Sequence, residues 1–276
     1  MEERFPRLYV IWRSWPDSFL KEFLAFGIKQ AYATLFGALL LAVIIVTHYV
    51  TMPFGIHRYD VIFVSAIVIQ IALVAFKLET KREVIMIAVF HVVATVMELF
   101  KTSGSIGSWT YPEASFFHIA TVPLFAGFMY SAVGSYIARV WRTFKFRYSN
   151  YPTVFATYVL AVFIYLNFFS HHFIPDIRWV LMAATAVLFC RTWIYFTVLH
   201  EERRMPLLLG FFLVSFFIWL AENIATYTHV WLYPSQYVTW HIVPAAKLSS
   251  WFLLMIISFV LISTIHDMIK DGRSTP

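Results

Sequence analysis

Charged residues and cysteine are both scarce in this sequence of 276 residues. Asp, Glu, Lys and Arg make up 13% of it, whereas about a quarter of the residues in typical soluble domains are charged. Hydrophobic residues make up 61%, and the mean hydropathy is +0.73. This composition excludes an ordinary soluble protein and indicates a chain that lies in a membrane. The one cysteine, Cys190, excludes an internal disulfide.

Several motifs of known chemistry are also missing. The sequence has no P-loop, no glycine-rich dinucleotide fingerprint, no GxSxG and no HExxH. Their absence argues against nucleotide hydrolysis and against the common zinc hydrolases. The pair His171 and His172 does not replace a metal motif, because adjacent side chains on a helix point about 100° apart. We therefore expect no metal and no cofactor.

Long apolar runs dominate what is present. Eight runs of roughly 20 residues are each long enough to cross the roughly 30 Å hydrocarbon layer as a helix. They lie at about 31–50, 60–77, 84–100, 116–138, 152–170, 178–199, 206–226 and 249–267. The runs do not alternate apolar and polar residues as membrane strands do. The predicted fold is an all-α, polytopic membrane helix bundle of about eight transmembrane helices.

The positions of Lys and Arg predict the orientation of this bundle. Cytoplasmic loops carry the excess of these residues, and a cytoplasmic N-terminus leaves only Arg58, Lys101, Arg178 and Lys247 on the outer side. With an even number of spans, both termini are predicted to be cytoplasmic in a multi-pass protein of the cell membrane. The net charge of +6 then complements anionic lipid headgroups, so we expect membrane lipids as partners and no nucleic acid.

A polar signature occurs twice: a carboxylate ends an apolar run, a Trp-x-Tyr-Pro loop follows, and a His and a Pro precede the next run. The first copy contains Glu98, Trp109, Tyr111, Pro112, His118 and Pro123, and the second contains Glu222, Trp231, Tyr233, Pro234, His241 and Pro244. The order predicts two parallel four-helix repeats, at 31–145 and 152–268. An interfacial or cytoplasmic segment, 1–30, precedes them, and a cytoplasmic tail, 269–276, follows.

Ionisable groups inside a span are costly and are functional candidates by default. The catalytic candidates are Glu98, Glu222, His91, His118 and His241. The candidates for substrate binding are Trp109, Tyr111, Trp231, Tyr233, Arg191, Lys101 and Asn223. Of these, Arg191 is predicted about 13 Å deep in its span, at about 1.5 Å per residue, where it would meet water in a cavity or an anionic ligand.

Each candidate also has a structural interpretation. The glutamates could end their helices in interfacial water, beside Lys101 and Lys247. Tryptophan and tyrosine collect at headgroup depth as anchors, and Arg191 could bind backbone carbonyls. The repeated order of the signature favours a site, because anchoring requires aromatic residues but no fixed order.

Residues 97–144, MELFKTSGSIGSWTYPEASFFHIATVPLFAGFMYSAVGSYIARVWRTF, are similar to the core of the YoaT-type family of bacterial integral membrane proteins, a domain of unknown function. This resemblance implies a membrane location and a bacterial source, and it transfers no catalytic residue. A weaker likeness exists to carotenoid hydratases and small lycopene cyclases, which also place a Glu before aromatic loop residues and a Pro.

Three functions are consistent with these observations. The first is a membrane-embedded acid/base site that acts on a lipid or isoprenoid at the outer side, where aromatic faces could stabilise a carbocation. The second is a proton-coupled transporter of a small solute, which could be anionic. The third is a membrane scaffold or regulatory subunit without chemistry of its own.

Overall fold

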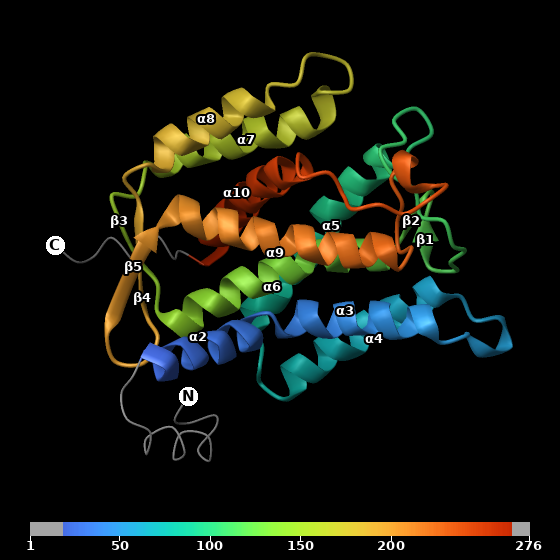
Figure 1. Ribbon diagram of the computed structural model, residues 1–276, viewed down its shortest axis with the longest axis horizontal. Helices are drawn as coiled ribbons and strands as arrows, with labels where there is room; N and C mark the ends of the chain where they lie inside the picture. The colour runs from blue at the N-terminus through green and yellow to red at the C-terminus, as the bar shows by residue number, and fades with distance from the viewer. Residues whose placement is uncertain (1–18, 267–276) are drawn as a thin grey trace.

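The computed structural model describes residues 19–266, and it describes the backbone alone at positions 81, 82, 86 and 264–266. The predicted tail, 269–276, lies outside this range, as does the greater part of the predicted segment 1–30. The described chain is mostly helical, and its helices lie side by side with their connections gathered at two ends (Figure 1).

Each of the predicted spans is occupied mainly by one helix. These helices are α3 (Leu35–Tyr49), α4 (Arg58–Ala75), α5 (Lys81–Lys101), α6 (Phe125–Phe144), α7 (Val154–Ser170), α8 (Arg178–Phe189), α9 (Leu207–Tyr227) and α10 (Lys247–His266). A further helix, α2 (Phe19–Ala33), precedes them, and two short 3-10 helices, η1 (Pro53–Gly55) and η2 (Pro234–Gln236), lie in loops.

Only some of these helices are long and apolar enough to cross a membrane. Within the described residues, α4, α9 and the Glu83–Lys101 part of α5 meet this requirement, and α2 with α3, bent by 70°, could form a fourth span. By contrast, α7, α8 and the Lys247–Ser263 part of α10 are shorter apolar helices. Membrane crossing by all eight helices therefore stays a prediction.

The predicted helical fold is confirmed in its coarser form, a mostly helical chain with a few short strands, but two predicted spans are partly wrong. Residues 118–123, inside the predicted span 116–138, form a small hairpin of β1 (His118–Ile119) and β2 (Val122–Pro123). The predicted span 178–199 ends early, because α8 stops at Phe189 and the chain enters β4 (Trp193–Thr197). A short apolar run cannot be assigned to helix or strand from its hydrophobicity alone, so the sequence pattern missed these three strands.

A three-stranded antiparallel sheet lies at one end of the helices, opposite the end that carries β1 and β2 (Figure 1). Its order is β3 (Arg147–Ser149), β4 and β5 (Glu202–Pro206), with Tyr148 opposite Ile194 and Tyr195 opposite Arg204. The basic residues Arg147, Arg203 and Arg204 therefore gather at the end that the positive-inside rule assigns to the cytoplasm.

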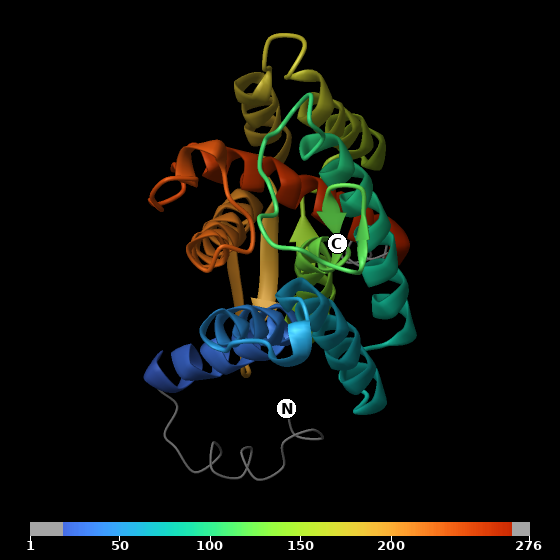
Figure 2. The same cartoon turned by 90° about the vertical axis from the view of Figure 1, so that its right-hand side faces the viewer.

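The helices form layers. The α7–α8 hairpin lies along one edge, α2 to α4 lie along the opposite edge, and α5, α6, α9 and α10 lie between them (Figures 1 and 2). The largest buried cluster joins α6, α7, α9 and α10 through residues such as Ile137, Ile164, Phe211 and Ile256. Apolar packing against α10 thus holds the middle layer to the α7–α8 hairpin.

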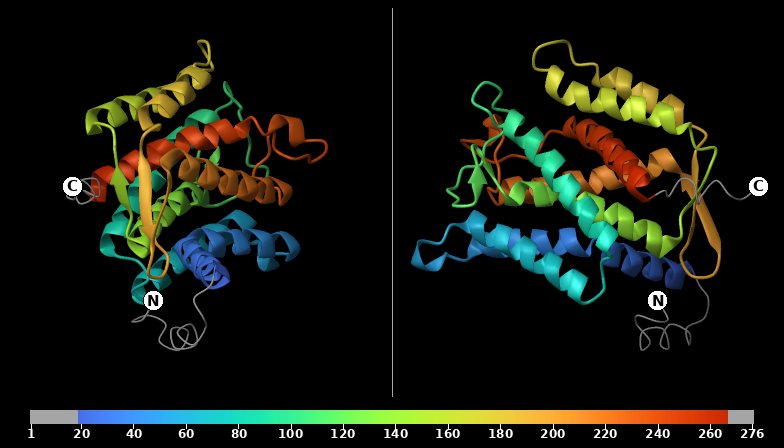
Figure 3. Two further views of the ribbon diagram at one scale, coloured as in Figure 1. Left: turned by 60° about the vertical axis from the view of Figure 1, so that its left-hand side comes forward. Right: turned by 180° about the vertical axis from the view of Figure 1, so that it is seen from behind.

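The neighbouring helices α5 and α6 cross at close range (Figure 3). Two glycines of α6 permit this contact, because a Cβ atom at Gly127 would lie 2.4 Å from His91 Nδ1 and one at Gly134 would lie 3.1 Å from Phe90 Cδ2. Small residues at helix interfaces in membranes let the backbones approach in this way.

A fully buried ion pair joins α6 to the connection between α4 and α5. Arg139 Nη2 lies 2.6 Å from Glu79 Oε1, and both side chains are 0% exposed. The Ser135 hydroxyl donates to the same carboxylate at 2.7 Å, and Arg139 Nη1 donates to the Tyr32 carbonyl at 3.1 Å. This network, which the sequence pattern did not indicate, connects α6, the end of α2 and the segment between α4 and α5.

Candidate functional site: two buried glutamates at one end of an apolar cavity

The Glu98 carboxyl group lies near the end of α5 and is 1% exposed. Its Oε2 atom accepts hydrogen bonds from Trp109 Nε1 and from the Tyr111 hydroxyl, both at 2.8 Å. Its Oε1 atom accepts one from the Tyr130 hydroxyl at 2.6 Å. Both oxygens of this buried acid are therefore satisfied by neutral donors.

The Glu222 carboxyl group of α9, which is 2% exposed, has a matching arrangement. Its Oε1 atom accepts from the Tyr233 hydroxyl at 2.6 Å, and its Oε2 atom accepts from Trp251 Nε1 at 2.7 Å. An indole N–H can only donate, so a carboxyl proton would need a tyrosine hydroxyl as its acceptor. For a proton on Oε1, that hydroxyl belongs to Tyr130 beside Glu98 and to Tyr233 beside Glu222.

The tyrosines of the two loops remain protonated donors. Burial raises the pKa of Tyr111 well above its ordinary value, and the adjacent Glu98 carboxylate adds to the shift. Burial and the Glu222 carboxylate likewise raise the pKa of Tyr233, which the Glu98 carboxylate also influences. The two acids therefore lie within electrostatic reach of the same tyrosine.

The two Trp-x-Tyr-Pro loops pair with each other. Thr110 and Leu232, the variable residues of the two motifs, form an antiparallel bridge in which each N–H donates to the other carbonyl at 2.9 Å. Beside this bridge, the Trp109 ring meets the Tyr233 ring edge-on at a centroid distance of 6.3 Å. The two Trp-x-Tyr-Pro loops, which are far apart in the sequence, thus pack together beside the glutamates.

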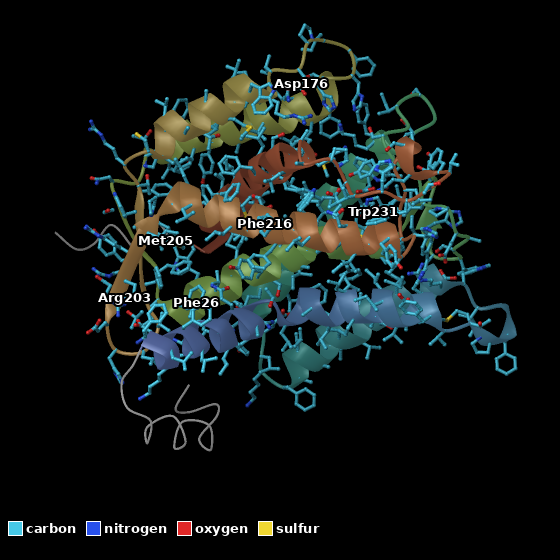
Figure 4. All side chains as sticks on the ribbon, in the orientation of Figure 1. Phe26, Asp176, Arg203, Met205, Phe216 and Trp231 are labelled. Atoms are coloured by element: carbon cyan, nitrogen blue, oxygen red, sulfur yellow. The ribbon has the colours of Figure 1, made fainter. Side chains whose placement is uncertain are left out.

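Both glutamates line a single cavity of about 860 Å³. Its lining is mostly apolar and extends along the helices from Trp231 at the loop end to Met205 and Phe26 near the three-stranded sheet (Figure 4). Such a shape, apolar with a few convergent polar groups, is typical of ligand sites. The two carboxyl groups give the cavity a polar end.

Three cations line the same polar end: Lys101, Arg178 and Lys247. Lys101 Nζ donates to His172 Nε2 at 2.9 Å. Burial, followed by the charge of Lys101, lowers the pKa of His172 to about 4, so the ring is neutral and can accept this bond. Arg178 pairs with Asp176 at 3.0 Å, and Lys247 Nζ lies 4.2 Å from the centroid of the Tyr233 ring.

The other predicted histidines lie away from this cavity. His91 packs against Gly127 and the Phe128 ring, and its buried Nδ1 atom has no hydrogen-bond partner. His118 and His241 are exposed and bind loop carbonyls, those of Ser115 for His118 and of Ser235 for His241. None of the three is among the lining residues, so the structure does not bring them to the glutamates.

The predicted polar ligands Asn223 and Arg191 also lie outside the cavity lining. Asn223 accepts from the Val243 N–H at 2.8 Å and donates to the Trp219 carbonyl, so it holds the loop before α10. The prediction that Arg191 is deeply buried in a span is wrong. It is exposed in the turn after α8, because the helix ends before reaching it.

Two site residues, Tyr130 and Trp251, were missed in the sequence because they lie on helices beyond the loop motif. A signal for both exists, since Tyr130 follows Pro123 by seven residues and Trp251 follows Pro244 by the same interval. Within residues 19–266, no group of three or more His, Cys, Asp or Glu side chains is arranged to hold a metal ion.

Comparison with known proteins agrees with the resemblance predicted from residues 97–144. A family described as a protein of unknown function (DUF817) matches residues 22–259. The uncharacterised protein YoaT of Bacillus subtilis (strain 168) is 42% identical over 256 residues, which cover 93% of this chain and 96% of that protein. No solved structure matches the chain. The family match spans most of the sequence, and the chain therefore belongs to the DUF817 family.

Proposed function

We propose that this chain is a multi-pass protein of a bacterial cell membrane that binds a lipid or isoprenoid in its apolar cavity and acts on it by acid/base chemistry. The observation that carries the proposal is that two buried glutamates, Glu98 and Glu222, line one mostly apolar cavity. An apolar chain would fill such a space favourably, at roughly 25 cal/mol per Å² of apolar surface removed from water.

Two parallel repeats with both termini in the cytoplasm belong to this proposal. In their support, each signature runs from a helix through a loop to the next helix, α5 to α6 and α9 to α10. The basic sheet lies at the end opposite the two loops (Figure 1). This orientation would place the polar end of the cavity at the outer side of the membrane.

The chemistry that fits is a shift of a carbon–carbon double bond. Glu98, protonated on Oε1, would transfer its proton to one alkene carbon and leave a carbocation on the other. The faces of Trp109, Tyr111 and Tyr233 would stabilise that cation. Loss of a proton from the neighbouring carbon to Glu222 would complete an isomerisation that needs no further reactant.

The test is Glu98→Gln, which keeps the side-chain shape and removes the acid. We expect cells that overexpress the unmodified chain to show a changed polyprenyl profile in their lipid extracts. Positioned acid/base groups contribute about 10²–10⁴-fold to rate, so cells that overexpress the variant should not show this change. Mass spectrometry of these extracts is the measurement. Glu201→Gln, at a side chain that is 73% exposed, is the control and should behave like the unmodified chain.

A proton-coupled transporter is the second candidate, and one observation favours it. The chain breaks between α2 and α3 with a bend of 70°, and Gln30, Ala31 and Thr34 at the break line the cavity. Broken helices are typical of substrate sites in transporters. In that case the lipid extracts of overexpressing cells would be unchanged. Liposomes containing the protein would instead take up protons together with a solute, and Glu98→Gln would abolish this uptake. If neither measurement changes, the scaffold alternative is favoured.

A further inference from the structure

The polar end of the cavity carries more than the two acids. Lys101, at the end of α5, Arg178, at the start of α8, and Lys247, at the start of α10, all line it. Three helices that are separated in the sequence therefore each place one positively charged side chain at the polar end of the cavity. None of these residues is needed for the proton transfers between Glu98 and Glu222.

The charge of these cations is only partly balanced. Asp176 pairs with Arg178, whereas within residues 19–266 neither Lys101 nor Lys247 forms an ion pair. Glu98 and Glu222 are bound instead by tyrosine and tryptophan donors. A buried ammonium without a counter-ion is costly, and Lys101 is only 4% exposed. An anionic group of a ligand would offset that cost.

The neighbours of Lys101 do not provide this anion. Lys101 Nζ lies 2.9 Å from His172 Nε2, 3.4 Å from His171 Nε2 and 5.9 Å from the centroid of the Phe168 ring, and none of these neutral rings carries a charge. Lys247 rests over the face of Tyr233. Both ammonium groups thus have neutral partners that hold them in place, and within residues 19–266 neither has a carboxylate within ion-pair distance.

We propose that the cavity binds an amphiphile with a phosphate or diphosphate headgroup on a single long apolar chain. The headgroup would lie among Lys101, Arg178 and Lys247, and the chain would extend along the apolar lining toward Phe26. Several cations suit the multiple charged oxygens of a phosphate better than the single charge of a carboxylate. This inference rests on the proposed function and defines its substrate class as a prenyl phosphate or a similar lipid phosphate.

The experiment is native mass spectrometry of the full chain in a nonionic detergent, titrated with farnesyl phosphate. Farnesol, which has the same chain without the phosphate, and inorganic phosphate are the comparison ligands. We expect farnesyl phosphate to bind at least tenfold more tightly than farnesol. Lys101→Gln and Lys247→Gln should each weaken farnesyl phosphate binding at least tenfold and leave farnesol binding unchanged, which also shows that the variants are folded.

Arg191→Gln is the matched control, because it removes one positive charge from an exposed residue outside the cavity. Equal affinity for farnesol and farnesyl phosphate, or equal loss in Arg191→Gln and Lys101→Gln, would overturn the inference. Displacement of farnesyl phosphate by an equal concentration of inorganic phosphate would also overturn it, since the ligand would then be a free anion. Charge-dependent binding together with unchanged lipid extracts would instead reject only the proposed isomerisation.

Discussion

At the scale of single residues, the protein surrounds its buried carboxylates with two different kinds of partner. Glu79 meets a guanidinium, that of Arg139, whereas the hydrogen-bond donors to Glu98 and Glu222 among residues 19–266 are hydroxyl and indole groups. An ion pair compensates the charge of the acid, and neutral donors satisfy its oxygens without compensating it. The first arrangement suits a structural connection, and the second suits a group that exchanges a proton.

This difference predicts different effects of the same substitution. Glu79→Gln leaves Arg139 buried without a counter-ion, and breaking one partner of a buried pair costs about 3–5 kcal/mol. We expect a clearly lower melting temperature in detergent. Glu98→Gln leaves no charge unpaired and should change the melting temperature far less. Equal melting temperatures for the two variants would contradict this account.

At the scale of elements, the apolar runs located helices well and located their ends poorly. Every predicted span overlaps a helix, because hydrophobicity over about 20 residues reports the surroundings of a whole segment. Residues 116–124 and 190–199 were wrongly predicted as helical, since there the chain is apolar but contains paired strands. The failure at 190–199 misplaced Arg191 inside a span.

The contact between α5 and α6 provides a prediction at this scale. Gly127→Ala would place a Cβ atom 2.4 Å from His91 Nδ1, and overpacking of this kind costs about 1–3 kcal/mol. We expect a lower melting temperature in detergent, partly restored when His91→Ala is added. Gly27→Ala is the matched control, because its Cβ would meet nothing within 4 Å, and it should not lower the melting temperature. If the second substitution restores nothing, the clash is not the cause.

At the scale of the whole molecule, the distribution of charge and loops predicts one orientation in the membrane. The basic sheet and the paired loops lie at opposite ends (Figure 1), so they should face opposite sides. In a Cys190→Ser background, Ser105→Cys in the loop after α5 should react with a membrane-impermeant maleimide in intact spheroplasts. Glu201→Cys, between β4 and β5, should react only after lysis.

Mass spectrometry of the labelled protein measures both reactions. Both replaced side chains are exposed, so access across the membrane decides the result. Labelling of Glu201→Cys alone in intact spheroplasts would reverse the orientation and place the polar end of the cavity at the cytoplasmic side. Labelling of both would contradict the membrane topology itself.

The sequence by itself determined the apolar character of the chain and the approximate places of eight helices, and it predicted Glu98, Glu222 and the two aromatic loops as site candidates. These are properties of segments, since hydropathy and motif order are read along the chain. Only the tertiary structure decided that Tyr130 and Trp251 complete the two acid sites, that both acids share one cavity, and that Lys101, Arg178 and Lys247 meet there. It also removed His91 and Arg191 from the site. The physical reason is that convergence depends on how distant helices pack and where each one ends.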